Sequence, residues 1–285
     1  MKIAVLSGKG GTGKTLVSVN LASAAKEAIY IDCDVEEPNG RLFFKPNNIA
    51  SESVSIKIPF ADQKLCIGCR KCIDFCKFNA IAFIINKVIV FDDVCHSCGG
   101  CVLFCPEKAL SEKDKIIGEV QSGVSENVSV ITGILNTGEA SGVPLIKKLL
   151  NNNLAGKELT FIDCPPGSAC IVMESIKDAD YCLMVAEPTL FGVHNLNMVY
   201  ELVKLFKKPN ATVLNKCLEG ENPAEDFCRE KDIKILGKIP FDSELGILNS
   251  NALISVRENQ KYRDMFSSML QIVAKEVQHE TVANS

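Results

Sequence analysis

Short apolar runs alternate with stretches of helical periodicity along most of the 285-residue chain. Apolar runs of about four to eight residues are typical of buried strands, and apolar residues that recur every three or four positions are typical of helices packed on a sheet. This alternation predicts an α/β domain. We expect strands at 3–6, 28–31, 53–59, 116–120, 128–135, 159–163, 180–186 and 211–216, and helices at 16–25, 143–150 and 256–276.

A glycine-rich segment stands between the first predicted strand and the first predicted helix. It matches G-x-x-x-x-G-K-[ST], the P-loop pattern, in the strand–turn–helix context that this pattern requires. Glycines let consecutive backbone N–H groups turn toward a phosphate, and the following helix directs its positive end at the same place. Lys14 is expected to bind the β- and γ-phosphates of a nucleotide, and the Thr15 hydroxyl to ligate Mg²⁺. The segment consists of Gly8, Lys9, Gly10, Gly11, Thr12, Gly13, Lys14 and Thr15.

Acidic residues follow two of the predicted strands. Asp32 and Asp34 come directly after 28–31, and Asp163 ends the strand 159–163 and opens the segment Asp-Cys-Pro-Pro-Gly. Carboxylates at the ends of parallel strands lie on the ligand side of a doubly wound sheet. An apolar strand that ends in an aspartate is also the arrangement expected of a Walker B acid for Mg²⁺. These acids are therefore predicted to lie beside the P-loop.

Eight of the 14 cysteines lie between Cys66 and Cys105, in two runs of the form C-x-x-C-x-x-C-x-x-x-C. Each cysteine of the second run follows its counterpart by 29 residues, and Phe75 and Phe104 match at the same offset. The segment is therefore an internal duplication, and it resembles the two-cluster bacterial ferredoxins. Zinc is the competing metal, but zinc sites more often use pairs of cysteines separated by longer loops.

The ferredoxin resemblance implies two 4Fe-4S clusters. In such proteins three closely spaced thiolates of a run bind one cluster, and the fourth thiolate of that run ligates the other cluster. Lys77 stands where Pro106 follows the last cysteine of the second run, which bears on the turn after Cys76 and not on ligation. A segment this small should need its metal to fold. Cluster one is expected to use Cys66, Cys69, Cys72 and Cys105, and cluster two Cys95, Cys98, Cys101 and Cys76.

Composition and charge argue against several classes of protein. The 31 basic and 35 acidic residues leave no basic footprint for a nucleic acid. No apolar run approaches the roughly 20 residues of a membrane span, and the C-terminal segment lacks the basic face of a membrane-binding helix. The first residues read as a strand rather than a signal peptide. We therefore expect a cytoplasmic protein without nucleic-acid or membrane partners, whose cysteines ligate metal rather than form disulfides.

The second lysine of the P-loop, Lys9, resembles the signature of the deviant P-loop ATPases, the class of MinD, ParA, Mrp and the nitrogenase iron protein. In that class this lysine reaches across a dimer to the nucleotide of the other subunit, which implies a homodimer. The resemblance gives catalytic roles to Lys9, Lys14 and Asp34, with Asp34 positioning the attacking water. It also implies a Mg²⁺ site made of Thr15, Asp32 and Asp163, and contacts to the adenine base from Asn215, Pro240 and Asp242.

The same resemblance implies a doubly wound, mostly parallel sheet with helices on both faces, interrupted by a small α+β ferredoxin-like domain. We expect residues 1–59 and 112–285 to form the ATPase domain, and residues 60–111 to form the insert.

The resemblance implies an ATP-binding and ATP-hydrolysing dimeric switch that couples nucleotide state to the maturation of iron–sulfur or other metal cofactors. An ATP-gated electron carrier is the first alternative, and a positioning ATPase like MinD or ParA is the second. A redox protein or a cluster-accepting protein is the expected partner. Cys170 is expected to be a buried small residue or an extra thiol used in cluster handling, because the chain has no cysteine between Cys105 and Cys164 to complete a bridging cluster of the nitrogenase type.

Overall fold

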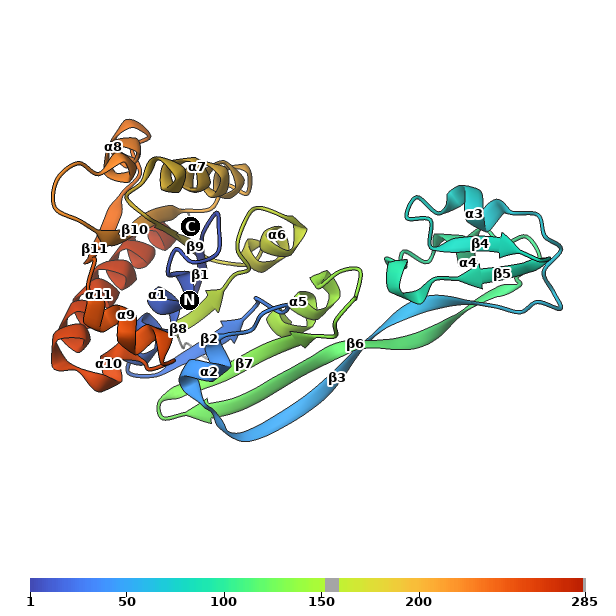
Figure 1. The fold of residues 1–285 in the computed structure, drawn as a ribbon, viewed down its shortest axis with the longest axis horizontal. Helices are drawn as coiled ribbons and strands as arrows, with labels where there is room; N and C mark the ends of the chain where they lie inside the picture. Colours follow the sequence, from blue (N-terminus) through green and yellow to red (C-terminus); the bar gives the residue numbers. More distant parts are fainter. Residues whose placement is uncertain (152–158, 284–285) are drawn as a thin grey trace.

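The computed structural model describes residues 1–151 and 159–283, with the side chains of 280–283 left out. Within these residues one large sheet has the strand order β11-β10-β9-β1-β8-β2-β7-β6-β3 (Figure 1). The strands from β11 to β7 are parallel, as the predicted doubly wound sheet requires. These strands are β1 (Lys2–Leu6), β2 (Ala28–Asp32), β7 (Val128–Leu135), β8 (Leu159–Asp163), β9 (Tyr181–Ala186), β10 (Asn210–Cys217) and β11 (Ile235–Pro240).

Alternate residues of the parallel strands face two separate cores. Ile3 and Val5 of β1 belong to the core under one layer of helices, and Ala4 and Leu6 belong to the core under the other. This explains why the strands read as continuous apolar runs, since both faces of a parallel sheet are covered. The first layer holds α1 (Lys14–Ala24), α9 (Ser243–Ser250), α10 (Ser255–Glu258) and α11 (Gln260–Ala283), and the second holds α5 (Val143–Leu150), α6 (Cys170–Ile176), α7 (Leu190–Leu205) and α8 (Pro223–Glu230).

The C-terminal helix predicted at 256–276 is interrupted. Asn259 has extended backbone dihedrals, and its side chain accepts a hydrogen bond from the N–H of Lys261 at 2.9 Å. An asparagine that bonds the backbone two residues ahead ends one helix and starts the next. The segment is therefore split into α10 and α11. In the described part of the chain, no helix combines the length and the apolar character needed to cross a bilayer.

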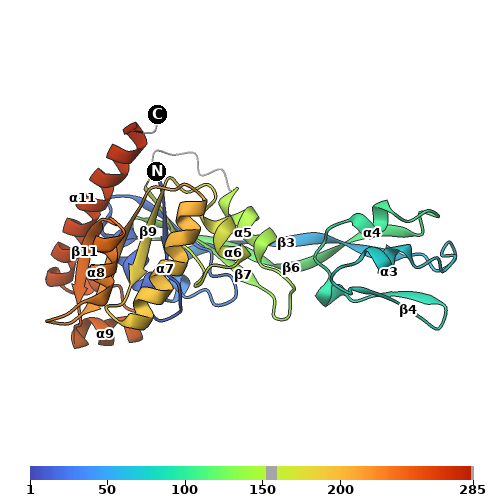
Figure 2. The same ribbon diagram turned by 90° about the horizontal axis from the view of Figure 1, so that it is seen from above.

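Two long antiparallel strands leave the sheet as a ribbon, which Figures 1 and 2 show in two views. They are β3 (Asn47–Ala61) and β6 (Leu110–Ser125), and only residues 118–125 of β6 also pair with β7. The predicted strands at 53–59 and 116–120 were therefore too short. Residues 47–52 of β3 are exposed, and residues 112–115 of β6 are all charged, so the alternation that marks a half-buried strand is lost in these two stretches.

Residues 62–109 form a small module at the far end of the ribbon (Figure 1). We call this segment the cysteine module. It contains a short antiparallel pair and short helical turns around two small cores. Its elements are α3 (Lys71–Phe75), β4 (Ile81–Ile84), β5 (Lys87–Val90), the 3-10 turn η1 (Asp92–Val94) and α4 (Gly100–Leu103), while the remaining helix of the described chain, α2 (Gly40–Phe44), lies between β2 and the ribbon.

The backbone of the cysteine module repeats with the same offset as its cysteines. Positive φ angles recur 29 residues apart at Gly68 and Ser97, at Arg70 and Gly99, and at Asn79 and Lys108. The matching phenylalanine rings of the two halves, those of Phe75 and Phe104, lie 5.0 Å apart between centroids. The duplication read from the sequence therefore extends to the conformation of the chain.

Candidate functional site

The P-loop connects β1 to α1 and lines a pocket at the carboxyl edge of the parallel sheet. Gly11 and Gly13 have φ angles of 80° and 93°, a conformation that side chains rarely adopt. A Cβ on Gly13 would lie 2.0 Å from the amide nitrogen of Asn215, so this position has no space for another residue. The walls of the pocket also include Asp34 and Pro166.

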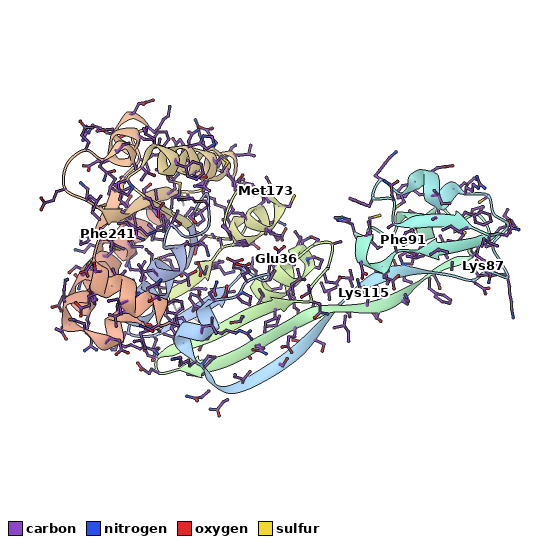
Figure 3. All side chains as sticks on the ribbon, in the orientation of Figure 1. Glu36, Lys87, Phe91, Lys115, Met173 and Phe241 are labelled. Carbon is purple, nitrogen blue, oxygen red and sulfur yellow. The ribbon has the colours of Figure 1, made fainter. Side chains whose placement is uncertain are left out.

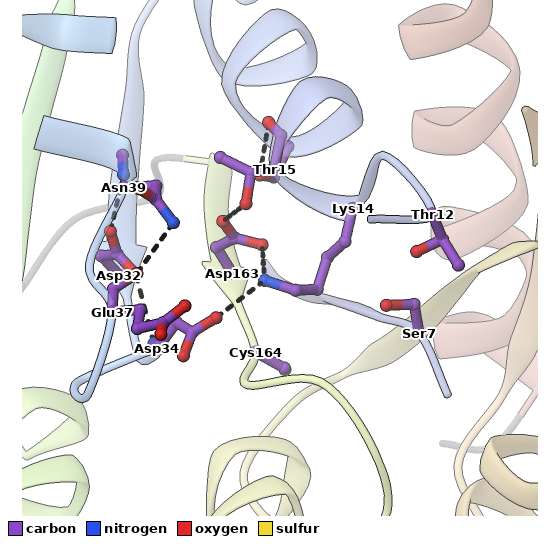
Figure 4. A network of polar contacts seen from close by, with 12 residues as sticks. Ser7, Thr12, Lys14, Thr15, Asp32, Asp34, Glu37, Asn39, Asp163 and Cys164 are labelled. Atoms are coloured by element: carbon purple, nitrogen blue, oxygen red, sulfur yellow. Dashed lines mark hydrogen bonds and ion pairs between the residues drawn. The ribbon is translucent and has the colours of Figure 1, made fainter. Parts of the chain in front are cut away.

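Asp163 is the central acceptor of the site (Figure 4). Its carboxylate accepts hydrogen bonds from the Lys14 ammonium at 2.8 Å, from the Thr15 hydroxyl at 2.8 Å and from the Tyr30 hydroxyl at 2.7 Å. Lys14 also faces Asp34, with 3.8 Å between their charged atoms. The structure thus brings together four of the predicted site residues. Tyr30 was missed, although a tyrosine within a fully buried strand needs a partner for its hydroxyl.

Asp32 lies behind this group and is 1% exposed. It accepts hydrogen bonds from the backbone N–H of Gly40 at 2.8 Å and of Asp34 at 3.2 Å. Burial, reinforced by the nearby charge of Asp163, raises the pKa of Asp32 to about 8. Burial also raises the pKa of Asp34 to about 6, against the opposing effect of Lys14.

This donor set fits Mg²⁺. Asp32, Asp34 and Asp163 surround Lys14, so carboxylates outnumber cations in the pocket. Carboxylate and hydroxyl oxygens are the ligands that Mg²⁺ takes in nucleotide sites. A bound divalent cation would relieve the repulsion that raises the pKa of Asp32. Thr15, Asp32 and Asp163 therefore remain the residues that could hold the ion.

Lys9 turns toward its own subunit. Its ammonium lies 2.7 Å from the carboxylate of Glu187 and 5.2 Å from the ring centroid of Phe191. Glu187 also accepts from Lys216 at 2.6 Å, and Lys216 donates to the carbonyl of Gly11 at 2.9 Å. Although burial opposes it, hydrogen bonding to the two lysines lowers the pKa of Glu187. Glu187 thus holds Lys9 beside the P-loop of the same chain.

The three predicted base contacts do not line the pocket. Asn215 donates from its amide nitrogen to the carbonyl of Thr12 at 2.8 Å, which holds the P-loop, and its oxygen accepts from the N–H of the next residue, Lys216, at 2.9 Å. Asp242 caps α9 through the N–H groups of Glu244 and Leu245. The role of Asn215, Pro240 and Asp242 at the base stays a prediction. The pocket wall contributed by the end of α9 is instead Asn249, Ser250 and Ala252, which the sequence reading did not single out.

One concave surface of the cysteine module is lined by all four cysteines assigned to cluster one, together with Ala61, Leu110 and neighbouring residues. Cys105 of this set accepts a hydrogen bond from the N–H of Ala109 at 3.2 Å. Thiolates are the ligands of iron–sulfur clusters, and N–H groups directed at sulfur tune such centres. The set at this surface is Cys66, Cys69, Cys72 and Cys105.

The cysteines assigned to cluster two also lie near one another. Burial raises the pKa of Cys95, and the nearby sulfurs of Cys98 and Cys76 add to the rise. Burial, with Cys95 and Cys98 adding to its effect, raises the pKa of Cys101 to about 11. Cys76 accepts from the N–H of Ala80 at 3.3 Å, the counterpart of the bond to Cys105, so Lys77 in place of proline leaves this contact intact.

Two observations bear on the choice between zinc and an iron–sulfur cluster, and a third concerns Cys170. Within residues 1–151 and 159–283, no three histidine, cysteine, aspartate or glutamate side chains converge closely enough to hold a single ion. Four sulfurs spread around one concave surface suit a multi-iron cluster better than one zinc ion. Cys170 is exposed at the start of α6, so the expectation of a buried small residue was wrong, and its alternative role as an extra thiol used in cluster handling stays a prediction.

Comparison with known families identifies the nucleotide-binding part. Residues 3–255 match the family described as the CobQ/CobB/MinD/ParA nucleotide binding domain. The chain belongs to this family. An uncharacterized protein of Methanocaldococcus jannaschii is 32% identical to this member of the CobQ/CobB/MinD/ParA family over 274 residues, which are 94% of this chain and 95% of that protein.

More distant relatives of this family member carry functional names. An iron-sulfur cluster carrier protein of Pyrococcus horikoshii is 27% identical over 276 residues, which are 86% of this chain and 78% of the carrier. The cell division ATPase MinD of Pyrococcus furiosus has a TM-score of 0.61 and 17% identity, with 96% of this chain and 98% of MinD covered. That likeness shows a shared fold. The large, mostly parallel sheet predicted from the sequence is therefore confirmed as one of the MinD type.

The raised pKa of Asp32 predicts how pH affects stability. In the folded, nucleotide-free chain this carboxyl keeps its proton to about pH 8, whereas in the unfolded chain it ionises near pH 4. Raising the pH from 5 to 8 should therefore lower the free energy of unfolding, by at most about 1.4 kcal/mol per pH unit from this group. The variant Asp32→Asn should show a shallower decline in urea titrations at the two pH values. Parallel pH profiles for the parent and Asp32→Asn would refute the assignment, and the exposed Asp178→Asn serves as the control.

Proposed function

We propose that this protein is an ATP-hydrolysing dimeric switch that carries two 4Fe-4S clusters and couples its nucleotide state to the maturation of iron–sulfur or other metal cofactors. The observation that carries the proposal is the connection of two sites by one ribbon. The P-loop pocket lies at one end of the structure, the module with eight cysteines lies at the other, and the antiparallel strands β3 and β6 connect the two. An iron-sulfur cluster carrier protein among the relatives supports this use.

Hydrolysis would depend on positioning and on charge stabilisation. With Mg-ATP in the pocket, Lys14 would leave Asp163 to bind the β- and γ-phosphates, and Thr15 and Asp163 would hold the ion. Asp34 lies beside Lys14, where it could orient a water toward the γ-phosphate. The backbone N–H groups of the P-loop would neutralise the charge that moves onto the leaving phosphate. No covalent nucleophile is needed.

A homodimer would complete the site through Lys9. In this structure Glu187 holds Lys9 within its own subunit, and Leu190 and Phe191 beside it expose 79% and 61% of their surface. Pairing of two subunits across this face would cover the two apolar side chains and give Lys9 a more strongly charged partner, the phosphates of the other subunit's nucleotide. Glu187 would then act as the resting partner of Lys9.

Removing Lys9 tests the shared active site. The variant Lys9→Ala should lower the steady-state rate of ATP hydrolysis by roughly 100-fold, because one preorganised charge at the phosphates is lost. Nucleotide affinity of the single subunit should change little, since Lys14 is retained. The exposed Lys26→Ala provides a control for the change of charge. Hydrolysis by Lys9→Ala at the parental rate would reject the role of Lys9.

The crossed assignment of the cysteines can be tested with pairs of substitutions. The anaerobically prepared parent should contain about eight irons per chain. The pair Cys66→Ser and Cys105→Ser removes two ligands of the same cluster, so about four irons should remain. The pair Cys95→Ser and Cys105→Ser removes one ligand from each cluster and should therefore change the visible absorption of both clusters. Cys217→Ser, in β10, is the matched control. A parent chain without iron would reject the clusters altogether.

Electron delivery is the second candidate, and one observation favours it. Each cysteine set supplies four sulfurs, and the fourth cysteine of each run accepts a backbone hydrogen bond. Full thiolate ligation favours clusters that are retained during reduction.

Cluster transfer separates the two candidates. If the protein matures cofactors, the iron-loaded chain should pass iron and sulfide to an apo-ferredoxin when the two are incubated with Mg-ATP. The transfer is measured from the visible absorption spectrum of the re-isolated ferredoxin. Retention of both clusters, together with reversible reduction by dithionite, would favour electron delivery. Exchange of ATP for ADP in the same assay shows whether either process depends on the nucleotide.

A further inference from the structure

A single lysine on the ribbon touches both the nucleotide-binding part and the cysteine module. Lys115 of β6 lies where the ribbon meets the module (Figure 3). Its ammonium is 2.9 Å from the carboxylate of Glu139, 3.0 Å from that of Asp93 and 3.2 Å from the carbonyl of Asp92. A lysine has three N–H donors, and these three contacts use all of them.

The contact with Glu139 is well shielded from water. The side chains of Lys115 and Glu139 are 16% and 9% exposed, whereas Asp93 is 82% exposed. Although burial opposes it, hydrogen bonding to Glu139 and Asp93 raises the pKa of Lys115. Removal of one partner of a shielded pair leaves the other charge uncompensated. The pair therefore fixes Lys115 more firmly than the exposed ion pairs elsewhere on the ribbon.

The loop that carries Glu139 lies directly behind the predicted switch residue Asp34. The next residue, Val35, accepts a hydrogen bond at its carbonyl from the N–H of Leu135 at 2.9 Å. A Cβ on Gly133 or on Gly142 would come within 2.7 Å of a methyl group of Val35, so the backbone packs closely against this side chain at both positions. A shift of Val35 would therefore displace the backbone at one of these glycines.

The same loop is also fastened to the ribbon. The N–H of Asn136 donates to the carbonyl of Ile117 at 2.8 Å, and its side chain donates to that of Ile116 at 3.3 Å. A shift of Val35 would thus reach the loop at 136–142 and, through it, the stretch of β6 that ends at Lys115.

On the other side, Lys115 holds the turn that precedes the second cysteine set. The η1 turn leads directly into Cys95, whose N–H donates to the carbonyl of Asp92 at 3.4 Å. Cys95 packs against Ile58 of β3 and against Ala80 in a small core of the module. Val35, next to Asp34, thus contacts both ends of the loop that carries Glu139, and Glu139 is joined through Lys115 to the η1 turn before Cys95.

We propose that Lys115 is a positioning residue that couples the loop behind Asp34 to the cysteine set of Cys95, Cys98, Cys101 and Cys76. Lys115 keeps the η1 turn and the 136–142 loop at a fixed separation, so a displacement of one segment displaces the other. The coupling of nucleotide to cluster rests on the proposed function. The bridge that Lys115 makes between the two protein segments does not rest on it.

Hydrogen exchange in the full chain tests the bridge first, on the anaerobically prepared protein as isolated and without added nucleotide. The variant Lys115→Met keeps most of the aliphatic stem and removes the ammonium. It should speed amide exchange in both 92–97 and 136–140, because one group holds both segments. Lys113→Met is the matched control, since Lys113 on the same strand pairs with Asp92 at 2.9 Å and, among the residues that the structure describes, has no ion-pair partner in the nucleotide-binding part. It should speed exchange in 92–97 alone. Exchange that changes in only one segment of Lys115→Met would overturn the bridge.

The second measurement adds a non-hydrolysable ATP analogue with Mg²⁺ to the iron-loaded chain. Nucleotide should change exchange in 92–97 and shift the reduction potential of one cluster in the parent and in Lys113→Met. Both changes should fall to less than half in Lys115→Met and in Glu139→Gln, which breaks the contact from the other end. A role confined to stability would lower the melting temperature but leave the nucleotide-dependent changes intact.

The outcomes separate the two proposals. A parent that binds no Mg-nucleotide or no iron contradicts the proposed function, while the first measurement still decides the bridge. A parent that binds both, with equal nucleotide-dependent changes in Lys115→Met, contradicts the coupling alone. Equal loss in Lys113→Met would also overturn it, because the effect would then belong to the ribbon as a whole.

Discussion

The carboxylate of Asp163 is the contact on which the nucleotide site depends. It stands at the end of a central strand, and it joins the start of α1 through Lys14 and Thr15 and the neighbouring strand β2 through Tyr30. Three donors on a single buried acid thus fix α1 and β2 relative to β8, which is distant from both in sequence. A buried charge with this many partners resists displacement unless another cation replaces the lysine. The site is thus organised to respond to a metal–nucleotide complex.

The ribbon is the second constraint, because it is the connection between the cysteine module and the nucleotide-binding part. A short hairpin would leave the cysteine module free to move on a flexible connection. Here thirteen residue pairs of β3 and β6 hold the two strands together from the sheet to the module. A paired ribbon bends less readily than two separate linkers, since each strand limits the torsions of the other. A displacement of β3 and β6 at the sheet would therefore move the cysteine module at their other end.

Local patterns were sufficient for the elements but not for the contacts between them. The bounds of β7 and α5 follow from apolar periodicity, and the eight cysteines follow from their spacing. The ribbon was underestimated because residues 47–52 of β3 are exposed and residues 112–115 of β6 are all charged, so neither stretch alternates, whereas the stretch predicted at 53–59 contains the buried Val54 and Ile58. Glu187 beside Lys9 and Glu139 beside Lys115 could not be found, since each pairs residues more than twenty positions apart. A charged residue carries no mark in the sequence that says which distant partner the fold will bring to it.

The two halves of the cysteine module have nearly the same backbone but different surroundings. The first set of sulfurs lines a concave surface with Ala61 and Leu110, where the ribbon ends, whereas Cys95 and Cys76 of the second set pack against Ile58, closer to the sheet. Only the second lies next to the turn held by Lys115. Two cysteine runs with equal spacing thus occupy an inner and an outer position, because the ribbon joins the rest of the chain next to only one of them.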